Sequence, residues 1–124
     1  MKLTKLRLTK EASNRVRFLA GKTGLQPNLL CRIGFCLSLE DPSVPNPDNF
    51  PEEDREFNRY TLLGEYDALF TALLMQRCST DGIPFEQVSE HFRAHMNRGM
   101  GLLQQRVRGI SDIADLVLSA ADKQ

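Results

Sequence analysis

The segment that most constrains the fold runs from Pro27 to Leu39, where apolar residues dominate and Arg32 is the only interior charge. Proline suits the first turn of a helix, so the sequence predicts a helix over residues 27–39. A helix that is apolar on most of its sides must be buried on most of its sides. The helix expected before it, from about Lys10 to Ala20, is too small to cover it. We therefore expect a partner subunit or the C-terminal half to complete the core.

A short strand precedes these two helices. Between Lys5 and Leu8, cations alternate with leucines, as on a strand that buries one face. Thr9 is a suitable N-cap for the first helix, and Gly21 and Gly24 bracket the turn that ends it. We expect both glycines to provide a positive φ or close packing that folding or subunit assembly requires.

The rest of the chain divides into a loop and a helical segment. Residues 40–56 contain four prolines among acidic residues, which predicts a loop because proline cannot continue a helix. Helical spacing of apolar residues returns from Arg59 to Arg77 and again from Pro84 to about Arg108. Ser111 is a suitable cap for a last helix, whose apolar residues we expect to face inward.

These patterns predict a mostly α, single oligomeric domain over residues 1–124. It comprises a basic, ribbon-helix-helix-like segment of one strand and two helices (1–39), an acidic loop (40–56) and a helical segment (57–124). In ribbon-helix-helix proteins, two chains pair their strands into a ribbon that can enter the DNA major groove. The alternative for the strand is an ordinary dimerisation element with solvated charges.

Charge is distributed unevenly along a chain whose net charge is zero. Residues 1–39 carry eight Lys or Arg and one acid, whereas residues 40–56 carry seven acids and one Arg. A basic segment attracts a polyanion even on a neutral chain, although the same cations could simply solvate two helices. Long cations suit phosphates better than base edges, which favours binding that is independent of sequence. The candidate DNA-binding residues are Lys2, Lys5, Arg7, Lys10, Arg17 and Lys22.

Motifs for catalysis and for cofactors are missing from the sequence. There is no phosphate loop, no nucleophile elbow and no nucleotide-binding fingerprint. His91 and His95 are four residues apart but lack the glutamate of a zinc protease helix, so we interpret them as surface or boundary histidines rather than metal ligands. Cys31, Cys36 and Cys78 include no C-x-x-C pair and are expected to be buried thiols. The sequence thus predicts a protein that is not an enzyme, with no catalytic residue, no metal and no cofactor.

A second group of cations lies in the C-terminal half. It could form another basic surface, or it could be a solvated helix flank that pairs with Glu86 and Glu90. Its members are Arg93, Arg98, Arg106 and Arg108.

The sequence also favours a cytoplasmic protein. No apolar run approaches the roughly 20 residues of a membrane span. The first residues are charged where a secretory signal is apolar. The three cysteines are an odd number without close spacing, which disfavours a disulfide framework.

Several segments resemble the DndE family of DNA sulfur modification proteins, and the resemblance covers nearly the whole chain. The residues that carry it are Arg7–Ala12, Arg15–Gly24, Pro27–Cys36, Arg55–Tyr66 and Phe92–Gly99.

The resemblance implies a role in DNA phosphorothioation, a modification of the restriction-modification type in which sulfur replaces a non-bridging phosphate oxygen. It implies that other subunits carry the chemistry and that this chain is a small, helical DNA-binding subunit, with nicked duplex as a candidate target. We expect a homo-oligomer, with a tetramer favoured. The alternatives are a ribbon-helix-helix transcription regulator and a protein–protein scaffold that does not bind DNA.

Overall fold

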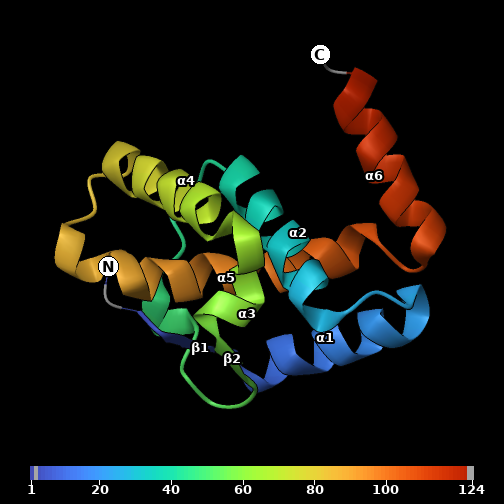
Figure 1. Cartoon of the computed structure of the whole chain (residues 1–124), viewed down its shortest axis with the longest axis horizontal. Coiled ribbons are helices and arrows are strands. Elements are labelled where there is room, and N and C mark those ends of the chain that lie inside the picture. Colours follow the sequence, from blue (N-terminus) through green and yellow to red (C-terminus); the bar gives the residue numbers. More distant parts are fainter. Residues whose placement is uncertain (2, 123–124) are drawn as a thin grey trace.

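Helices make up most of the structure, a computed structural model that describes residues 1 and 3–122, with side chains up to residue 120 (Figure 1). The prediction of a mostly α chain, with a short N-terminal strand followed by two helices, is confirmed. The elements are β1 (Lys5–Arg7), α1 (Lys10–Thr23), α2 (Pro27–Glu40), η1 (Pro47–Asn49), β2 (Glu56–Asn58), α3 (Arg59–Leu63), η2 (Gly64–Tyr66), α4 (Asp67–Thr80), η3 (Phe85–Gln87), α5 (Val88–Arg106) and α6 (Ile110–Asp122), where η marks a one-turn 3-10 helix.

Helix α1 begins as its sequence predicts and ends later. The Thr9 hydroxyl accepts a hydrogen bond from the Ala12 amide at 3.0 Å, which is an N-cap. The helix passes through Gly21 and continues to Thr23, one turn beyond the predicted end. It stops at Gly24, whose φ of 76° lies in the left-handed region that glycine adopts without strain.

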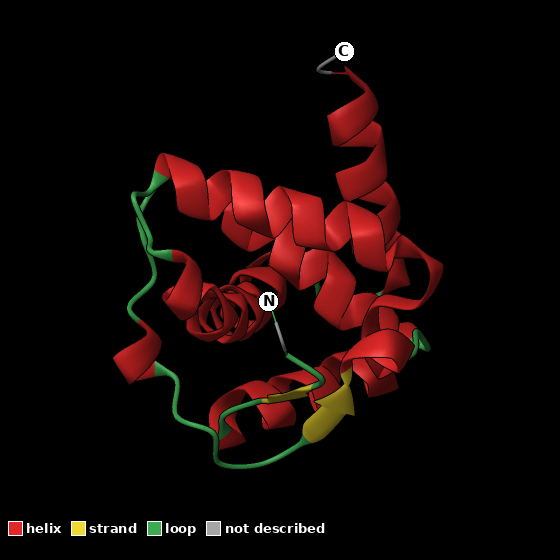
Figure 2. Cartoon of the chain, turned by 60° about the vertical axis from the view of Figure 1, so that its left-hand side comes forward, coloured by secondary structure: helices red, strands yellow, loops and turns green. Residues whose placement is uncertain are grey.

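The N-terminal strand pairs within its own chain. β1 and β2 are antiparallel, with Leu6 opposite Phe57 and Arg7 opposite Glu56 (Figure 2). Leu6 and Phe57 are buried, and their neighbours along each strand are exposed, as the alternation predicted for β1 requires. The second strand of the ribbon therefore comes from the end of the acidic loop.

Helix α2 is covered mainly by α5, so the C-terminal half supplies the cover that its apolar sequence demands. The two helices meet at Gly34 and Gly99, where a Cβ on Gly99 would overlap the carbonyl group of Gly34. Glycine inside a helix costs roughly 1 kcal/mol relative to alanine, and here it permits backbone contact between the helices. Beside this crossing, the Phe35 ring packs against Phe70 and Phe92, with centroid separations of 5.6 and 5.5 Å.

The helix predicted from Arg59 to Arg77 is interrupted. Gly64, with φ 57° and ψ −138°, ends α3 before η2 and α4 begin. Arg32 of α2 fills this break, because its Nε donates to the Leu62 carbonyl at 2.6 Å. A Cβ on Gly64 would lie 3.0 Å from the Arg32 guanidinium. The prediction of one helix was wrong, because Gly64 turns the backbone out of helical geometry and Arg32, some 30 residues earlier, bonds a carbonyl at the break.

Helix α6 projects from the rest of the molecule (Figures 1 and 2). Its start is capped by Asp112, whose Oδ2 accepts from the amides of Arg108 at 2.8 Å and of Gly109 at 3.2 Å. The predicted cap, Ser111, lies inside the helix. The prediction that the apolar residues face inward is wrong for Val117, which is 65% exposed because no other element lies over it. Within the described part of the chain, no helix could span a membrane.

Candidate nucleic-acid interface

The cations predicted to bind DNA occupy two different surroundings, and the first is the exposed face of β1. Lys5 Nζ lies 3.7 Å and Arg7 Nε 3.5 Å from the carboxylate of Glu56. The antiparallel register places Glu56 directly across from Arg7. One carboxylate therefore offsets part of the charge of both cations. Lys2 lies outside the described residues.

Helix α1 provides the second surrounding. Lys10, Asn14, Arg17 and Gly21 follow one another at spacings of four, three and four residues, which places them along one side of the helix. All four are exposed, and so is Lys22. Among the described residues, no carboxylate lies within ion-pair distance of Lys10, Arg17 or Lys22. We call Lys10, Arg17 and Lys22 the α1 cations, and their charge is available to a polyanion.

The end of this surface adjoins a groove between α1 and α5. The groove has a volume of about 460 Å³ and is lined by Phe18, Lys22, Gln104 and Arg108. Phe18 is 45% exposed, and Lys22 Nζ lies 5.7 Å from the centre of its ring. Phe18 and Gln104 were missed by sequence reasoning, because an aromatic ring on one helix and an amide on another give no local signal that they share a groove.

Arginines of α4 and α5 hold the acidic loop between Asp41 and Glu52, whereas its last residue, Glu56, pairs with the N-terminal cations of β1. Arg93 Nε donates to the Phe50 carbonyl at 2.8 Å, and its Nη1 lies 3.3 Å from Glu52. Arg93 was expected to be a solvated residue or to pair with Glu86 or Glu90. That expectation was wrong, because the loop returns across α5 and offers closer acceptors.

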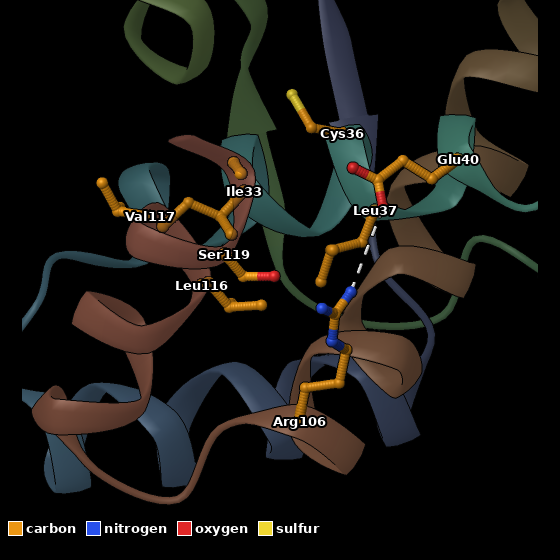
Figure 3. A pocket seen from close by; sticks show the side chains of 9 residues that line it. Ile33, Cys36, Leu37, Glu40, Arg106, Leu116, Val117 and Ser119 are labelled. Carbon is orange, nitrogen blue, oxygen red and sulfur yellow. Dashed lines mark ion pairs between the residues drawn. The ribbon is translucent and has the colours of Figure 1, made fainter. Parts of the chain in front are cut away.

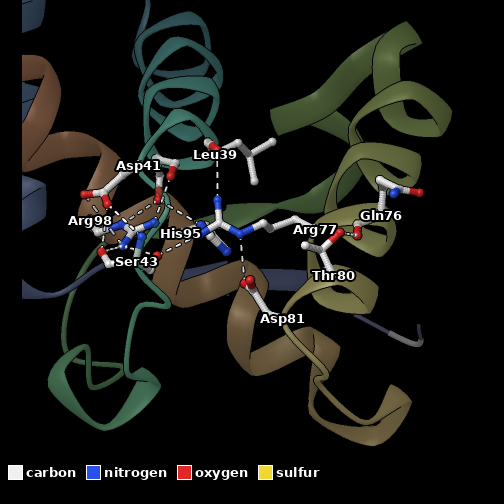
Figure 4. A network of polar contacts seen from close by, with 10 residues as sticks. Leu39, Asp41, Ser43, Gln76, Arg77, Thr80, Asp81, His95 and Arg98 are labelled. Atoms are coloured by element: carbon white, nitrogen blue, oxygen red, sulfur yellow. Dashed lines mark hydrogen bonds and ion pairs between the residues drawn. The ribbon is translucent and has the colours of Figure 1, made fainter.

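Arg77 and Arg98 hold the start of the same loop (Figure 4). Arg77 donates to the carbonyls of Leu39 at 2.8 Å and Ser43 at 2.7 Å, and its Nε pairs with Asp81 at 2.8 Å. Arg98 donates to the Ser43 carbonyl at 2.8 Å as well. Guanidinium groups with so many protein acceptors are structural, because their donors are already satisfied.

The predicted second basic surface is therefore divided. Arg93 and Arg98 bind the acidic loop, and Arg106 Nη1 lies 4.0 Å from Glu40 Oε2. Arg108 alone joins the candidate interface, beside Lys22 in the groove.

Both histidines of α5 are buried, so the prediction of surface or boundary positions was wrong. His95 is 0% and His91 5% exposed, because α5 lies across the centre of the molecule. Ser38 Oγ accepts from Arg98 Nε at 2.8 Å and also lies within hydrogen-bond distance of His95 Nδ1, at 2.8 Å. Burial, together with the charges of Arg98 and Arg77, lowers the pKa of His95 to about 3. His95 is therefore a neutral structural residue.

The thiols differ from one another. Cys31 and Cys78 are buried as predicted, and burial raises the pKa of Cys31 to about 12. Cys36 is exposed, contrary to the prediction, because it lies on the side of α2 that α5 leaves open. Within the described residues, no group of three or more His, Cys, Asp or Glu side chains is arranged to hold a metal ion.

Cys36 lies in a groove between α2 and α6 (Figure 3). The groove has a volume of about 390 Å³, and its walls include Ile33 and Leu37 of α2 and Leu116 and Val117 of α6. Figure 3 shows Arg106 on one side, paired with Glu40. Its mainly apolar walls suit contact with protein better than contact with phosphate.

The two glycines of the predicted turn also differ. Gly24 has the positive φ that favours glycine. Gly21 has no positive φ, and a Cβ there would meet nothing within 4 Å. The structure therefore shows neither the positive φ nor the close packing that was proposed for Gly21. A role of either glycine in subunit assembly stays a prediction.

Comparison with known proteins agrees with this arrangement of elements. The chain resembles the crystal structure of DndE from Escherichia coli B7A, involved in DNA phosphorothioation modification, with a TM-score of 0.66 and 21% identity over 83% of this chain and 99% of that one. It also resembles the crystal structure of a DndE G21/24K mutant involved in DNA phosphorothioation, with a TM-score of 0.62 and 19% identity over 82% of this chain and 99% of that one. At these identities the likeness shows the fold.

No curated protein sequence matches the chain. The family model described as DNA sulphur modification protein DndE matches residues 5–110, which includes every described element from β1 to α5. The resemblance inferred from sequence is confirmed, and the chain belongs to the DndE family of DNA sulphur modification proteins.

Proposed function

We propose that the chain is a non-catalytic DNA-binding subunit of the phosphorothioation machinery and that it binds duplex DNA through backbone phosphates. The observation that carries the proposal is the exposure of the α1 cations, whose charges meet no carboxylate among the described residues. The chain belongs to a family of DNA sulphur modification proteins, so DNA is the polyanion that the α1 cations would bind. Other subunits would then supply the chemistry.

Binding of this kind depends on charge rather than on base sequence. Cations that contact phosphates release counterions, so affinity falls as salt rises, with a slope of about 0.9 per phosphate contact in a plot of log affinity against log salt. A nick makes the duplex easier to bend, which would favour nicked DNA. A homo-oligomer would multiply weak contacts by raising their effective concentration.

The test is fluorescence anisotropy with intact, nicked and unrelated duplexes across a range of salt. We expect tight binding at low salt, little dependence on sequence and tighter binding at a nick. Replacing all three α1 cations with alanine should weaken binding at least tenfold and lower the salt slope by up to about 3, since each lost phosphate contact contributes about 0.9. The proposal fails if the wild-type protein does not bind at low salt.

A matched control is the replacement of Lys5 and Arg7 with alanine. These cations already face Glu56, so their loss should reduce affinity much less than the loss of the α1 cations. Equal losses of DNA affinity from both variants would show that the ion pairs with Glu56 do not reduce the contribution of Lys5 and Arg7 to DNA binding.

The second candidate is a protein–protein scaffold, which a surface on α2 favours. Leu29, Ile33, Cys36, Tyr66 and Phe70 line an open groove of about 350 Å³ beside Arg32. Leu29 and Tyr66 are exposed there beside the more buried Ile33 and Phe70, and an exposed apolar patch favours contact with another protein. Absence of DNA binding at low salt would leave this candidate in place. Tight binding to one operator-like sequence would favour a transcription regulator.

A further inference from the structure

An exposed aromatic ring lies among the cations at the end of the candidate interface. Val16 and Leu19, on the inner side of α1, are fully buried, whereas Phe18 is 45% exposed. Its ring lines the groove between α1 and α5 together with Lys22, Gln104 and Arg108. Figure 1 shows that the C-terminal end of α1 lies near the connection between α5 and α6, from which Arg108 comes.

The groove combines the groups that hold an unpaired nucleotide. Aromatic rings bind bases by stacking, whatever the base. Lys22 and Arg108 are suited to the phosphates that flank such a base. The Gln104 amide has both donors and an acceptor for a base edge. The volume of about 460 Å³ is within the range of sites that hold small organic molecules.

An intact duplex cannot use such a site, because its base faces are covered by neighbouring base pairs. At a nick or a strand end, the terminal base has lost one covalent neighbour and leaves the stack at lower cost. We propose that the groove of Phe18, Lys22, Gln104 and Arg108 binds an unstacked base at a nick or strand end, with Phe18 as its stacking platform. The inference rests on the proposed DNA-binding function and adds the residues by which a break is distinguished from intact duplex.

The experiment compares two dumbbell DNAs whose ends are closed by hairpin loops, one intact and one with a single nick. We measure their affinity for wild-type protein and for Phe18→Ala, Phe18→Trp and Phe85→Ala. Phe85 is a matched control, because it is 61% exposed and lies outside the groove. Phe18→Trp keeps an aromatic platform and should retain the preference for the nick.

We expect Phe18→Ala to weaken binding to the nicked dumbbell about tenfold, within the range known for loss of base–aromatic stacking. Binding to the intact dumbbell should change less than about twofold, because the α1 cations supply it. A 2-aminopurine placed at the nick should brighten with wild-type protein, as the base leaves the duplex stack, and remain dim with Phe18→Ala. Phe85→Ala should behave as wild type.

Two results would overturn the inference and leave the proposed function in place. One is equal affinity of the wild-type protein for both dumbbells. The other is a nick preference that Phe18→Ala preserves. If Phe18→Ala changes the oligomer mass, Phe18 is a subunit contact and the inference also fails. Failure of the wild-type protein to bind either dumbbell would overturn the proposed function as well.

Discussion

Positive charge has different roles in two regions of the molecule. The arginines of α4 and α5 bond to protein acceptors, whereas the α1 cations face solvent. The side chains of Arg77 and Arg98 are 11% and 14% exposed, and both donate to the Ser43 carbonyl of the acidic loop and to carbonyls at the end of α2. Arg17 is exposed, and within the described part of the chain its guanidinium donates only to Asn14, at 3.0 Å. A guanidinium surrounded by protein acceptors stabilises the fold, whereas one that faces solvent is available to a ligand. A basic residue therefore cannot be assigned to a DNA surface until its acceptors are known.

The acidic loop connects these two regions. Three arginines hold it against α4 and α5, and its last residues form β2. Strand pairing then brings Glu56 against the cations of β1. The structural arginines thus help decide which of the N-terminal cations remain free for DNA.

The largest effect expected from breaking this arrangement is on stability. Arg98→Ala should lower the free energy of unfolding by about 3 kcal/mol, because it removes the charge-assisted hydrogen bonds of a largely buried guanidinium to Ser38 and Ser43. Urea denaturation measures this. Arg17→Ala, the matched change on α1, should cost less than about 0.5 kcal/mol. Similar losses from the two variants would contradict the division into structural and free arginines.

The next largest effect is a loss of stability in acid, because burial, together with the charges of Arg98 and Arg77, keeps His95 neutral. The folded pKa of His95 is about 3, against 6.5 for the unfolded group. The unfolded state therefore binds the proton first as pH falls. Stability is full above about pH 6.5 and declines towards pH 3, by up to about 1.4 kcal/mol per pH unit.

Denaturation at pH 7 and pH 5 checks this expectation. The wild-type protein should lose about 2 kcal/mol between these values through His95. His95→Asn, which keeps an acceptor for Ser38, should show a smaller loss. Burial also lowers the pKa of His91, so some pH dependence should remain. An unchanged loss in His95→Asn would show that the histidine does not carry the effect.

A smaller effect separates the two glycines at the end of α1. Gly24→Val should destabilise the chain by about 1–2 kcal/mol, because a side chain is strained at φ 76°. Gly21→Val should not, because the position is helical and open. If Gly21→Val nevertheless changes the oligomer mass in light scattering, this side of α1 is a subunit contact and is not fully open to DNA.

The smallest effect concerns the balance of charge at β1. Glu56→Gln should raise affinity for duplex DNA about two- to threefold at low salt, because Lys5 and Arg7 lose a competing carboxylate. The gain should vanish when both cations are also replaced with alanine, which a double-mutant cycle in anisotropy measures. A gain that persists would mean that Glu56 repels DNA directly and not through its ion pairs.

Much of the fold follows from local patterns in the sequence. Thr9 caps α1, Leu6 of β1 faces inward, and α2 needs cover because its sequence is apolar. Each of these features depends on neighbours within a turn of helix or on alternate residues of a strand, so the printed order of residues is sufficient. Exposure of the α1 cations was predictable for the same reason.

The tertiary structure decided the features of the fold and of the candidate interface that depend on contacts between distant residues. The partner of β1 comes from Glu56–Asn58, the break at Gly64 is filled by Arg32, and the arginines of α5 turn towards a loop rather than to solvent. It also buried His95 and placed Phe18 beside Arg108. These contacts join residues that are 30 to 90 positions apart, and they exist only once α2 and α5 have packed. By itself the sequence determined which segments are helical and where free charge is concentrated, because those properties are local. Which charges remain free depends on long-range contacts that only the packed chain creates.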